Sequence, residues 1–156
     1  MKIRWKTLLI CIAIPLAVGG LSALISGGGM ETFNMVEKPP LSPPGWLFPV
    51  VWTILYTLMG IASYLVFTAG ADRETTDKAL YTYAIQLLVN FFWSIIFFNF
   101  HLYLFAFVWL CLLWVLIVLT MVQFWRIKPL AAYLLIPYLL WVTFAGYLNL
   151  GIYLLN

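Results

Sequence analysis

Hydrophobic residues in this chain fall into five long blocks, and charged residues are confined to the stretches outside them. Each block holds about 20 or more largely apolar residues, the length an α-helix needs to cross the hydrocarbon core of a bilayer. No Asp, Glu, Lys or Arg lies inside any block. The pattern therefore predicts five membrane-spanning helices, over residues 7–26, 46–69, 79–99, 102–125 and 130–155.

The longest polar stretch, residues 27–45, separates the first two blocks. Loops of this length in compact proteins are usually functional. Prolines stiffen its second half, because each holds φ at about −65°, while the glycines at 27–29 leave the first half free to move. We interpret the loop as a lid over the helix ends, with simple punctuation between helices as the alternative. Ser42 is the predicted N-cap of the second helix, with Pro43 at its first position.

The composition requires lipid as the solvent of this chain. Of its 156 residues, 65% are hydrophobic and only 8% are charged. Soluble domains carry roughly a quarter of charged residues, so this chain lacks the polar groups to cover a water-exposed surface. We expect an all-α integral membrane protein in which residues 1–156 form a single five-helix domain.

The basic residues predict how the bundle is oriented. Seven of the eight lie before the first block or in the second and fourth connections, and only Lys38 lies in the first connection. With five spans, those three regions share one side of the membrane, and basic residues favour the cytoplasmic side. We therefore expect a cytoplasmic N-terminus, with the lid, His101 and the C-terminus outside. The net charge of +3 reflects this orientation and does not indicate nucleic-acid binding.

The predicted spans lack the groups that most catalysts and pumps use. Ion-coupled transporters keep an ionisable residue within the membrane, and acid–base catalysis needs positioned titratable side chains. His101 lies at a helix end, where a lone histidine is more often solvated than bound to haem iron. Cys11 and Cys111 lie in apolar blocks and resemble small apolar side chains. The sequence therefore disfavours an active transporter and a hydrolase, and it predicts no metal site.

Aromatic and amide side chains recur at helical spacing in three of the blocks. Residues three or four apart share a helix face, and each such face here combines flat rings with hydrogen-bonding groups or a small residue. This lining suits a pocket for a flat, largely apolar ligand. Because 19% of the residues are aromatic, the alternative is that these faces only pack the helices together. The faces comprise Trp52, Tyr56 and Ser63; Gln86, Asn90, Trp93 or Ser94, and Phe97; and Trp141, Ala145 and Asn149.

Small residues and prolines inside the blocks add two further expectations. Pro15 and Pro137 each remove a backbone donor, and the resulting kinks can splay neighbouring helices and leave a cavity. Gly19, Ala23 and Gly27 recur at intervals of four. Such a seam packs closely against another helix, either of a partner chain or within the monomer.

Three motifs resemble one protein family. The segment EKPPLSPPGWLFPVVWTILYTLMGIA is similar to the loop-to-second-helix signature of the translocator protein family, also called tryptophan-rich sensory proteins. LLVNFFWSIIFF resembles the third-helix motif of that family, and LIPYLLWVTFAGYLNLGIY resembles the fifth. The resemblance implies a five-helix bundle, usually a homodimer, that binds tetrapyrroles such as protoporphyrin IX beneath its first loop. It also implies binding of sterol-like lipids and of isoquinoline or benzodiazepine drugs, as in animal members, and it implies no required cofactor.

The resemblance also assigns residues to the expected ligand pocket. The family's pocket positions correspond to Trp52, Asn90, Phe97, Trp141 and Ala145, and Pro43 lies in the covering loop. With Phe33, Tyr56 and Trp93, these are the predicted ligand-binding residues.

Two departures from the family pattern bear on activity. Many bacterial relatives have a Trp-Tyr pair where this chain has Thr32-Phe33, and loop and pocket aromatics are implicated where such relatives degrade protoporphyrin in light. The replacement puts that activity in doubt. The C-terminal sterol motif of animal members needs a basic residue after a tyrosine, and none follows Tyr147 or Tyr153. Its absence lowers the expectation of sterol binding modestly.

These observations predict a tetrapyrrole-binding sensor or carrier in a bacterial cytoplasmic membrane. The first alternative is a light-dependent enzyme that degrades protoporphyrin, in which Trp52 and Trp141 would be the catalytic candidates. The second alternative is a passive transporter of porphyrins or sterols. The sequence leaves the choice among these three functions open.

Overall fold

The computed structural model describes residues 2–27 and 29–156, except for the side chains of residues 29, 30 and 32. The described residues form helices and no strand, and five helical units are long and apolar enough to cross a membrane. The predicted five-helix all-α fold is thus confirmed. The long units are α1 (Trp5–Ile25), α3 (Leu47–Phe67), α4 (Arg73–Ser94) continued by the π-helix η1 (Ile95–Asn99), α5 (Tyr103–Ile127), and α6 (Pro129–Leu134) followed by α7 (Ile136–Leu155).

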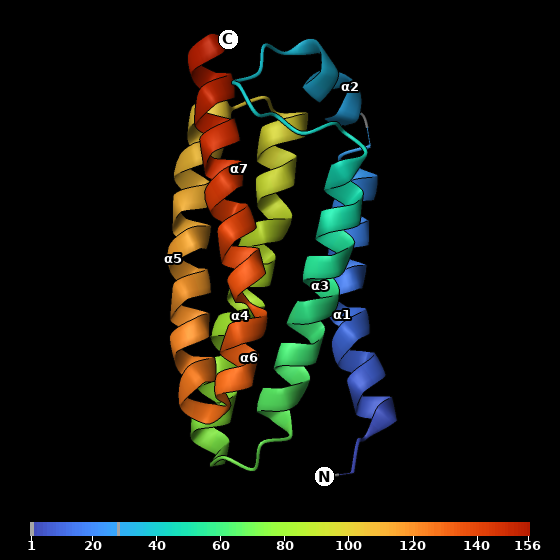
Figure 1. Ribbon diagram of the computed structural model, residues 1–156, viewed down its shortest axis with the longest axis vertical. Coiled ribbons are helices and arrows are strands. Elements are labelled where there is room, and N and C mark those ends of the chain that lie inside the picture. Colours follow the sequence, from blue (N-terminus) through green and yellow to red (C-terminus); the bar gives the residue numbers. More distant parts are fainter. Residues whose placement is uncertain (1, 28) are drawn as a thin grey trace.

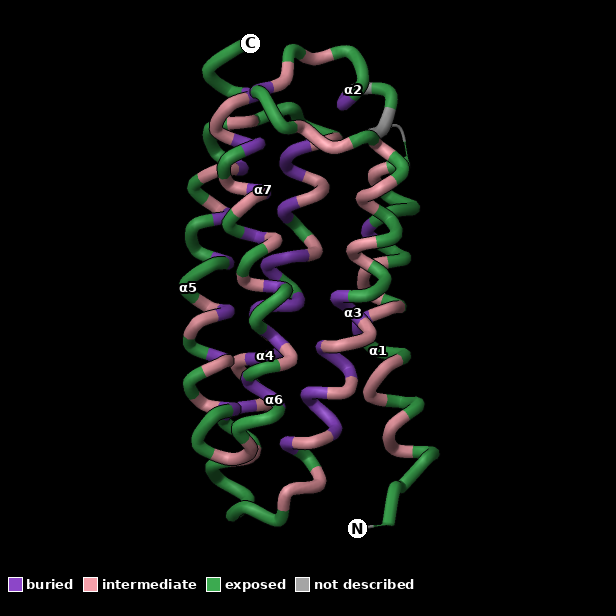
Figure 2. Tube along the Cα trace, in the orientation of Figure 1, coloured by how far each residue is buried: buried purple, intermediate pink, exposed green. Residues whose placement is uncertain are grey.

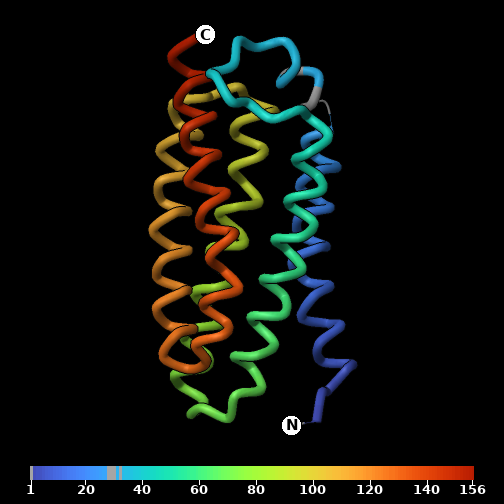
Figure 3. The backbone as a smooth tube through the Cα atoms, in the orientation of Figure 1, coloured from blue at the N-terminus to red at the C-terminus, as the bar shows by residue number. Residues whose placement is uncertain are grey.

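The five units lie side by side and alternate in direction, so the chain's two ends lie at opposite ends of the bundle (Figure 1). Helix α1 packs against α3 and α4, and α4 packs against α5. Helix α5 contacts both α6 and α7, and α6 closes the ring by packing against α3. Connections between successive spanning units are short apart from the first, whose described part after residue 28 crosses the end of the bundle where α7 ends (Figure 3).

Buried residues concentrate on the sides of the helices that are turned toward the interior of the bundle (Figure 2). Many large apolar residues are exposed on the outside. The core includes Met59, Leu113 and Val142, none of which is exposed. Leu24 and Leu140, by contrast, are 80% and 64% exposed. An apolar exterior of this extent fits a protein whose long faces contact lipid chains rather than water.

Two helix starts differ from those predicted. Helix α4 begins at Arg73 rather than at residue 79, because the Asp72 carboxylate accepts hydrogen bonds from the Thr75 N–H (3.0 Å) and hydroxyl (2.9 Å). These bonds hold the pKa of Asp72 below its usual value. The polar first turns therefore continue the helix beyond the apolar block. The predicted N-cap at Ser42 is wrong: α3 begins at Leu47, and the Ser42 hydroxyl instead donates to the Pro39 carbonyl at 2.7 Å.

The two prolines predicted to kink their helices behave differently. Pro15 lies within an unbroken α1. Near Pro137 the fifth span divides, with α6 ending at Leu134 and α7 starting at Ile136, so Pro137 falls in the first turn of α7. Proline is well tolerated there because first-turn N–H groups have no partner within the helix.

The segment of residues 29–45, where the sequence predicts a lid, lies across the bundle end at which α7 ends (Figure 3). It contains a short helix, α2 (Gly29–Met35), which the sequence pattern did not predict, followed by the proline-rich segment. Gly28, at the centre of the expected glycine hinge, lies outside the described residues. We refer to residues 29–45 as the lid.

Candidate ligand cavity

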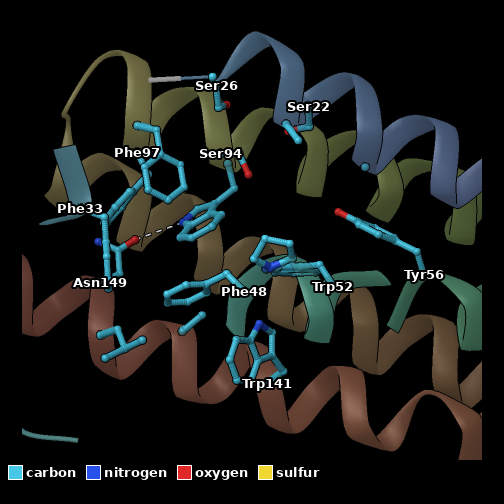
Figure 4. A pocket seen from close by; sticks show the side chains of 18 of the residues that line it. Ser22, Ser26, Phe33, Phe48, Trp52, Tyr56, Ser94, Phe97, Trp141 and Asn149 are labelled. Carbon is cyan, nitrogen blue, oxygen red and sulfur yellow. Dashed lines mark hydrogen bonds between the residues drawn. The ribbon is translucent and has the colours of Figure 1, made fainter. Parts of the chain in front are cut away.

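A cavity of about 260 Å³ lies beneath the lid, between α1, α3, α4 with η1, and α7 (Figure 4). Most of the atoms that face it are apolar, and many belong to aromatic rings. The lining residues are Gly19, Ser22, Ala23, Ser26 and Gly27 of α1 and the segment after it; Phe33 of the lid; Phe48, Pro49, Trp52 and Tyr56 of α3; Trp93, Ser94, Phe97 and Phe98 of α4 and η1; and Trp141, Ala145, Leu148, Asn149 and Ile152 of α7.

Helix α3 supplies one aromatic wall. Trp52 and Tyr56 are four residues apart, so they share a helix face, and their rings stack with centroids 5.4 Å apart. Phe48, one turn earlier, lies between the lid and α7, because its ring meets Phe33 at 5.1 Å and Trp141 at 5.8 Å. These rings present flat faces and edges to the space between them.

The opposite wall comes from the end of the third span. Trp93 stacks on Phe97 with ring centroids 5.3 Å apart, and its Nε1 donates to Asn149 Oδ1 at 3.1 Å. The Asn149 amide in turn donates to the Tyr103 carbonyl at 2.8 Å. The π-helix η1 widens the turn here, and both Phe97 and its neighbour Phe98 line the cavity. Short π-helices of this kind occur frequently at functional sites.

Helix α1 forms a wall of small residues. Gly19, Ala23 and Gly27, which the sequence predicted to pack against a helix of a partner chain or of the monomer, line the cavity. At Gly19 the contact lies within the monomer, because a methyl group there would overlap the ring of Tyr56. Ser22 is tied to α4 by a hydrogen bond from its hydroxyl to the Phe91 carbonyl at 3.2 Å.

The lid closes the cavity with Phe33, which is only 4% exposed. The Lys38 ammonium donates to the Phe33 carbonyl at 2.8 Å and lies 4.9 Å from the centroid of the Phe33 ring. The side chain of Asn156 accepts from the Glu37 N–H at 3.2 Å and donates to the Glu37 carbonyl at 2.8 Å. The end of α7 therefore holds the lid in place.

Two buried polar atoms at the cavity lack a hydrogen-bond partner among the described residues. These are the indole Nε1 of Trp141 on α7 and the hydroxyl oxygen of Ser26 at the end of α1. A buried donor without a partner is costly, and a ligand that carries an acceptor would satisfy it. The cavity thus combines apolar walls with two free polar groups on different helices.

The structure brings together seven of the nine predicted ligand-binding residues and leaves two apart. Asn90 is buried below the cavity, where its amide donates to the Tyr138 hydroxyl at 2.9 Å, and that hydroxyl donates to Gln86 Oε1 at 2.6 Å. Pro43 lies in the lid and does not line the cavity. The residues that do line it are Phe33, Trp52, Tyr56, Trp93, Phe97, Trp141 and Ala145.

Residues outside the predicted set also contribute to the cavity. Phe48 and Ile152 fit the same helical spacing as Trp52 and Asn149, so their position could have been inferred from the stripes. Phe98 also fits, because it lies four residues after Ser94, although it falls within the π-helix η1. Ser63, placed on the α3 stripe by its spacing, bonds to the Gly60 carbonyl at 2.8 Å and does not line the cavity.

The single histidine, His101, lies in the connection between the third and fourth spans. His101 is exposed and has a φ of +56°, a left-handed conformation that ends the third span before α5 begins. Histidine adopts this conformation more readily than most residues with a side chain. Within the described residues, no group of three or more His, Cys, Asp or Glu side chains could hold a metal ion.

These features define an integral membrane protein with a largely apolar cavity within a bundle of five spanning units. The sequence profile of the TspO/MBR family matches residues 11–155, and the chain belongs to this family. It is 42% identical to the tryptophan-rich protein TspO of Chlorobaculum tepidum over 151 residues, which cover 96% of each chain. It is 33% identical to the tryptophan-rich sensory protein of Cereibacter sphaeroides, covering 100% of this chain and 95% of the relative. It is also 37% identical to the translocator protein of Homo sapiens, covering 82% of this chain and 76% of the relative.

Proposed function

We propose that this protein binds flat, largely apolar molecules in the cavity, with tetrapyrroles such as protoporphyrin IX as the leading ligand class. It would act as a sensor or carrier in a bacterial cytoplasmic membrane. The observation that carries the proposal is a cavity lined by aromatic rings, which offers stacking faces and few polar atoms. Sterol-like lipids and isoquinoline or benzodiazepine compounds share that chemistry and are secondary candidates.

The proposal gives each cavity residue a role. Trp52, Phe97 and Trp141 stack on the ligand, and Ala145 leaves it room. The free Nε1–H of Trp141 donates to an acceptor on the ligand, such as a propionate or a carbonyl oxygen. Asn90 acts indirectly. Its amide donates a hydrogen bond to the hydroxyl of Tyr138, and the Tyr138 ring contacts Trp52 with centroids 6.2 Å apart.

The size of the cavity sets a condition on binding. Its volume of about 260 Å³ is below the roughly 300–1,000 Å³ of typical small-molecule sites. A tetrapyrrole is a large ligand by this standard, so at least one wall must move to admit it. Binding should accordingly be slower than diffusion allows.

A titration in the dark tests this proposal. Protoporphyrin IX added to the protein in lipid nanodiscs should quench tryptophan fluorescence until the site is saturated. Replacing Trp141 by Phe removes an indole N–H from the cavity and should weaken the affinity at least about tenfold, because a hydrogen bond to a charged group contributes about 1.5–3 kcal/mol. The matched control is Trp125→Phe, which changes an exposed tryptophan that does not line the cavity. Quenching without saturation, or equal affinity in both variants, would point to partitioning into lipid.

Illumination of the same samples tests the photochemical alternative. Trp52 and Trp141 both line the cavity, which favours their contact with any bound porphyrin. Phe33 lacks the phenol that many bacterial relatives place in the lid, and the side chain of Thr32 lies outside the described residues. We therefore expect the porphyrin spectrum to stay unchanged in light. A new absorbing product that disappears in Trp52→Phe would support the enzyme instead.

A further inference from the structure

We propose that the ligand reaches the cavity sideways from the bilayer, through an apolar groove between α3 and α7, with Trp141 as the wall that moves. This inference rests on the proposed function, because it concerns how the ligand of that cavity gains access. The groove lies on the outer face of the bundle. Its lining residues are Val51, Ile54, Leu55, Pro137, Leu140, Trp141 and Phe144.

The groove suits a ligand dissolved in lipid. Ile54 and Leu140 are 55% and 64% exposed on this membrane-spanning face, and the side chains that line the groove are apolar apart from the indole nitrogen of Trp141. A flat apolar molecule concentrates in the hydrocarbon region because its transfer from water is favourable. From there it meets the groove without returning to water.

Trp141 separates the groove from the cavity and lines both. On the cavity side its ring contacts Phe48, with centroids 5.8 Å apart. On the groove side it contacts Phe144, with centroids 5.6 Å apart. Rotation of this one side chain would therefore join the two spaces.

Hydrogen bonding leaves Trp141 freer to rotate than three other tryptophans of the spans. The indole nitrogens of Trp93, Trp109 and Trp114 donate to Asn149 Oδ1 (3.1 Å), the Val89 carbonyl (2.7 Å) and the Thr143 hydroxyl (2.9 Å), respectively. The Nε1 of Trp141 has no such partner within the described chain. Its rotation breaks no hydrogen bond, and the ligand can supply the missing acceptor at the end of its path.

The path through the lid is more strongly closed. Opening it would break both bonds between Glu37 and Asn156, and also the bond from the Tyr147 hydroxyl to the Pro40 carbonyl at 2.6 Å. It would also withdraw Phe33 from its buried position. The lateral path requires none of these changes.

The packing of the helices explains why a groove exists at this place. Helix α3 packs against α1 and α6, and its contacts with α7 are few. The chain steps from α6 to α7 at Leu135, next to Pro137, and α7 then diverges from α3 toward the lid (Figure 1). Side chains rather than backbone contacts therefore fill the space between the two helices.

Association rates separate the two paths. Protoporphyrin IX delivered from lipid vesicles would be mixed rapidly with the protein in nanodiscs, and both the rate of quenching and its saturation recorded. Two variants, Leu140→Phe and Ile54→Phe, fill the groove. The matched control is Leu112→Phe, which makes the same Leu-to-Phe change at an exposed position of α5 outside the groove. The double variant Asn156→Ala/Tyr147→Phe loosens the lid. We expect the groove variants to slow association by about tenfold, within the range over which association rates vary among related variants, with the dissociation constant and the other variants unchanged.

Each other outcome overturns the inference. Faster association in the lid variant, with normal rates in both groove variants, would assign access to the lid. A changed dissociation constant without a changed association rate would make the groove part of the bound site. A change in oligomeric state, measured by light scattering, would make it a contact between copies of the chain. Saturable binding in the native protein with normal rates in the groove variants defeats only the lateral path, whereas absence of saturable binding defeats the proposed function itself.

Discussion

Gly19 and Gly20 are neighbours in α1 with opposite surroundings, and they allow the cavity wall to be tested at single residues. A methyl group at position 19 would overlap the Tyr56 ring, whereas at position 20 it would meet no atom within 4 Å. Tyr56 cannot yield freely because it stacks on Trp52. Gly19→Ala should therefore lower the free energy of unfolding by about 1–3 kcal/mol, as overpacking does. Gly20→Ala should raise it by about 0.5–1 kcal/mol, because alanine favours the helix.

Unfolding of both variants in detergent, followed by circular dichroism, measures the difference. Porphyrin affinity should fall with Gly19→Ala as Tyr56 shifts, and it should not change with Gly20→Ala. If the two variants were equally stable and bound ligand equally, α1 would not pack against Tyr56 as described.

Residue identity alone predicted the aromatic part of the cavity better than its polar part. Trp52, Trp93 and Trp141 lie on helix faces whose spacing is visible in the sequence, and all three line the cavity. Asn90 shares a face with Trp93 by the same rule, yet its amide is used by Tyr138. Spacing shows which face of a helix a residue occupies. It does not show whether a side chain from a neighbouring helix will take up its hydrogen bonds, as Tyr138 does for Asn90.

Among the elements, the contact between the lid and α7 offers the clearest prediction. Gly151 lies directly under Pro39, and a methyl group there would overlap the proline ring. Gly151→Ala should therefore displace the lid and speed amide exchange at Glu37, whose N–H donates to Asn156. Hydrogen exchange with mass spectrometry would measure this effect.

Gly146 on the same helix provides the matched control. A methyl group there would lie 3.7 Å from Leu110, which is ordinary contact. Gly146→Ala should leave exchange in the lid unchanged. Equal exchange in the two variants would mean that Pro39 does not hold the lid against α7.

Element boundaries depended on interactions that the hydrophobic pattern does not contain. The five hydrophobic blocks predicted the number of spanning helices, because the thickness of the bilayer sets the length of apolar sequence that each helix needs. The start of α4 at Arg73 depends on the Asp72 cap, and the start of α3 depends on how the proline segment folds before it. The π-helix Ile95–Asn99 and helix α2 have no signature in apolar periodicity, because tertiary contacts select them.

Across the whole molecule, the distribution of basic residues predicts how the bundle is oriented in the membrane. The N-terminal segment and the α3–α4 and α5–α6 connections lie at one end, and the lid lies at the other (Figure 1). Seven of the eight basic residues belong to the first end. Translocating that end would carry far more positive charge across the membrane than translocating the lid, which has only Lys38. We therefore propose that the lid lies outside the cytoplasm.

Cysteine labelling in intact cells tests this orientation. With Cys11 and Cys111 replaced by alanine, Met35→Cys adds an exposed thiol to the lid, and Ala71→Cys adds one to the α3–α4 connection. A membrane-impermeant maleimide should label position 35 in intact cells and position 71 only after permeabilisation. The reverse pattern would invert the bundle, and labelling of both in intact cells would mean that it inserts both ways. In either case the lid would face the cytoplasm in at least part of the population.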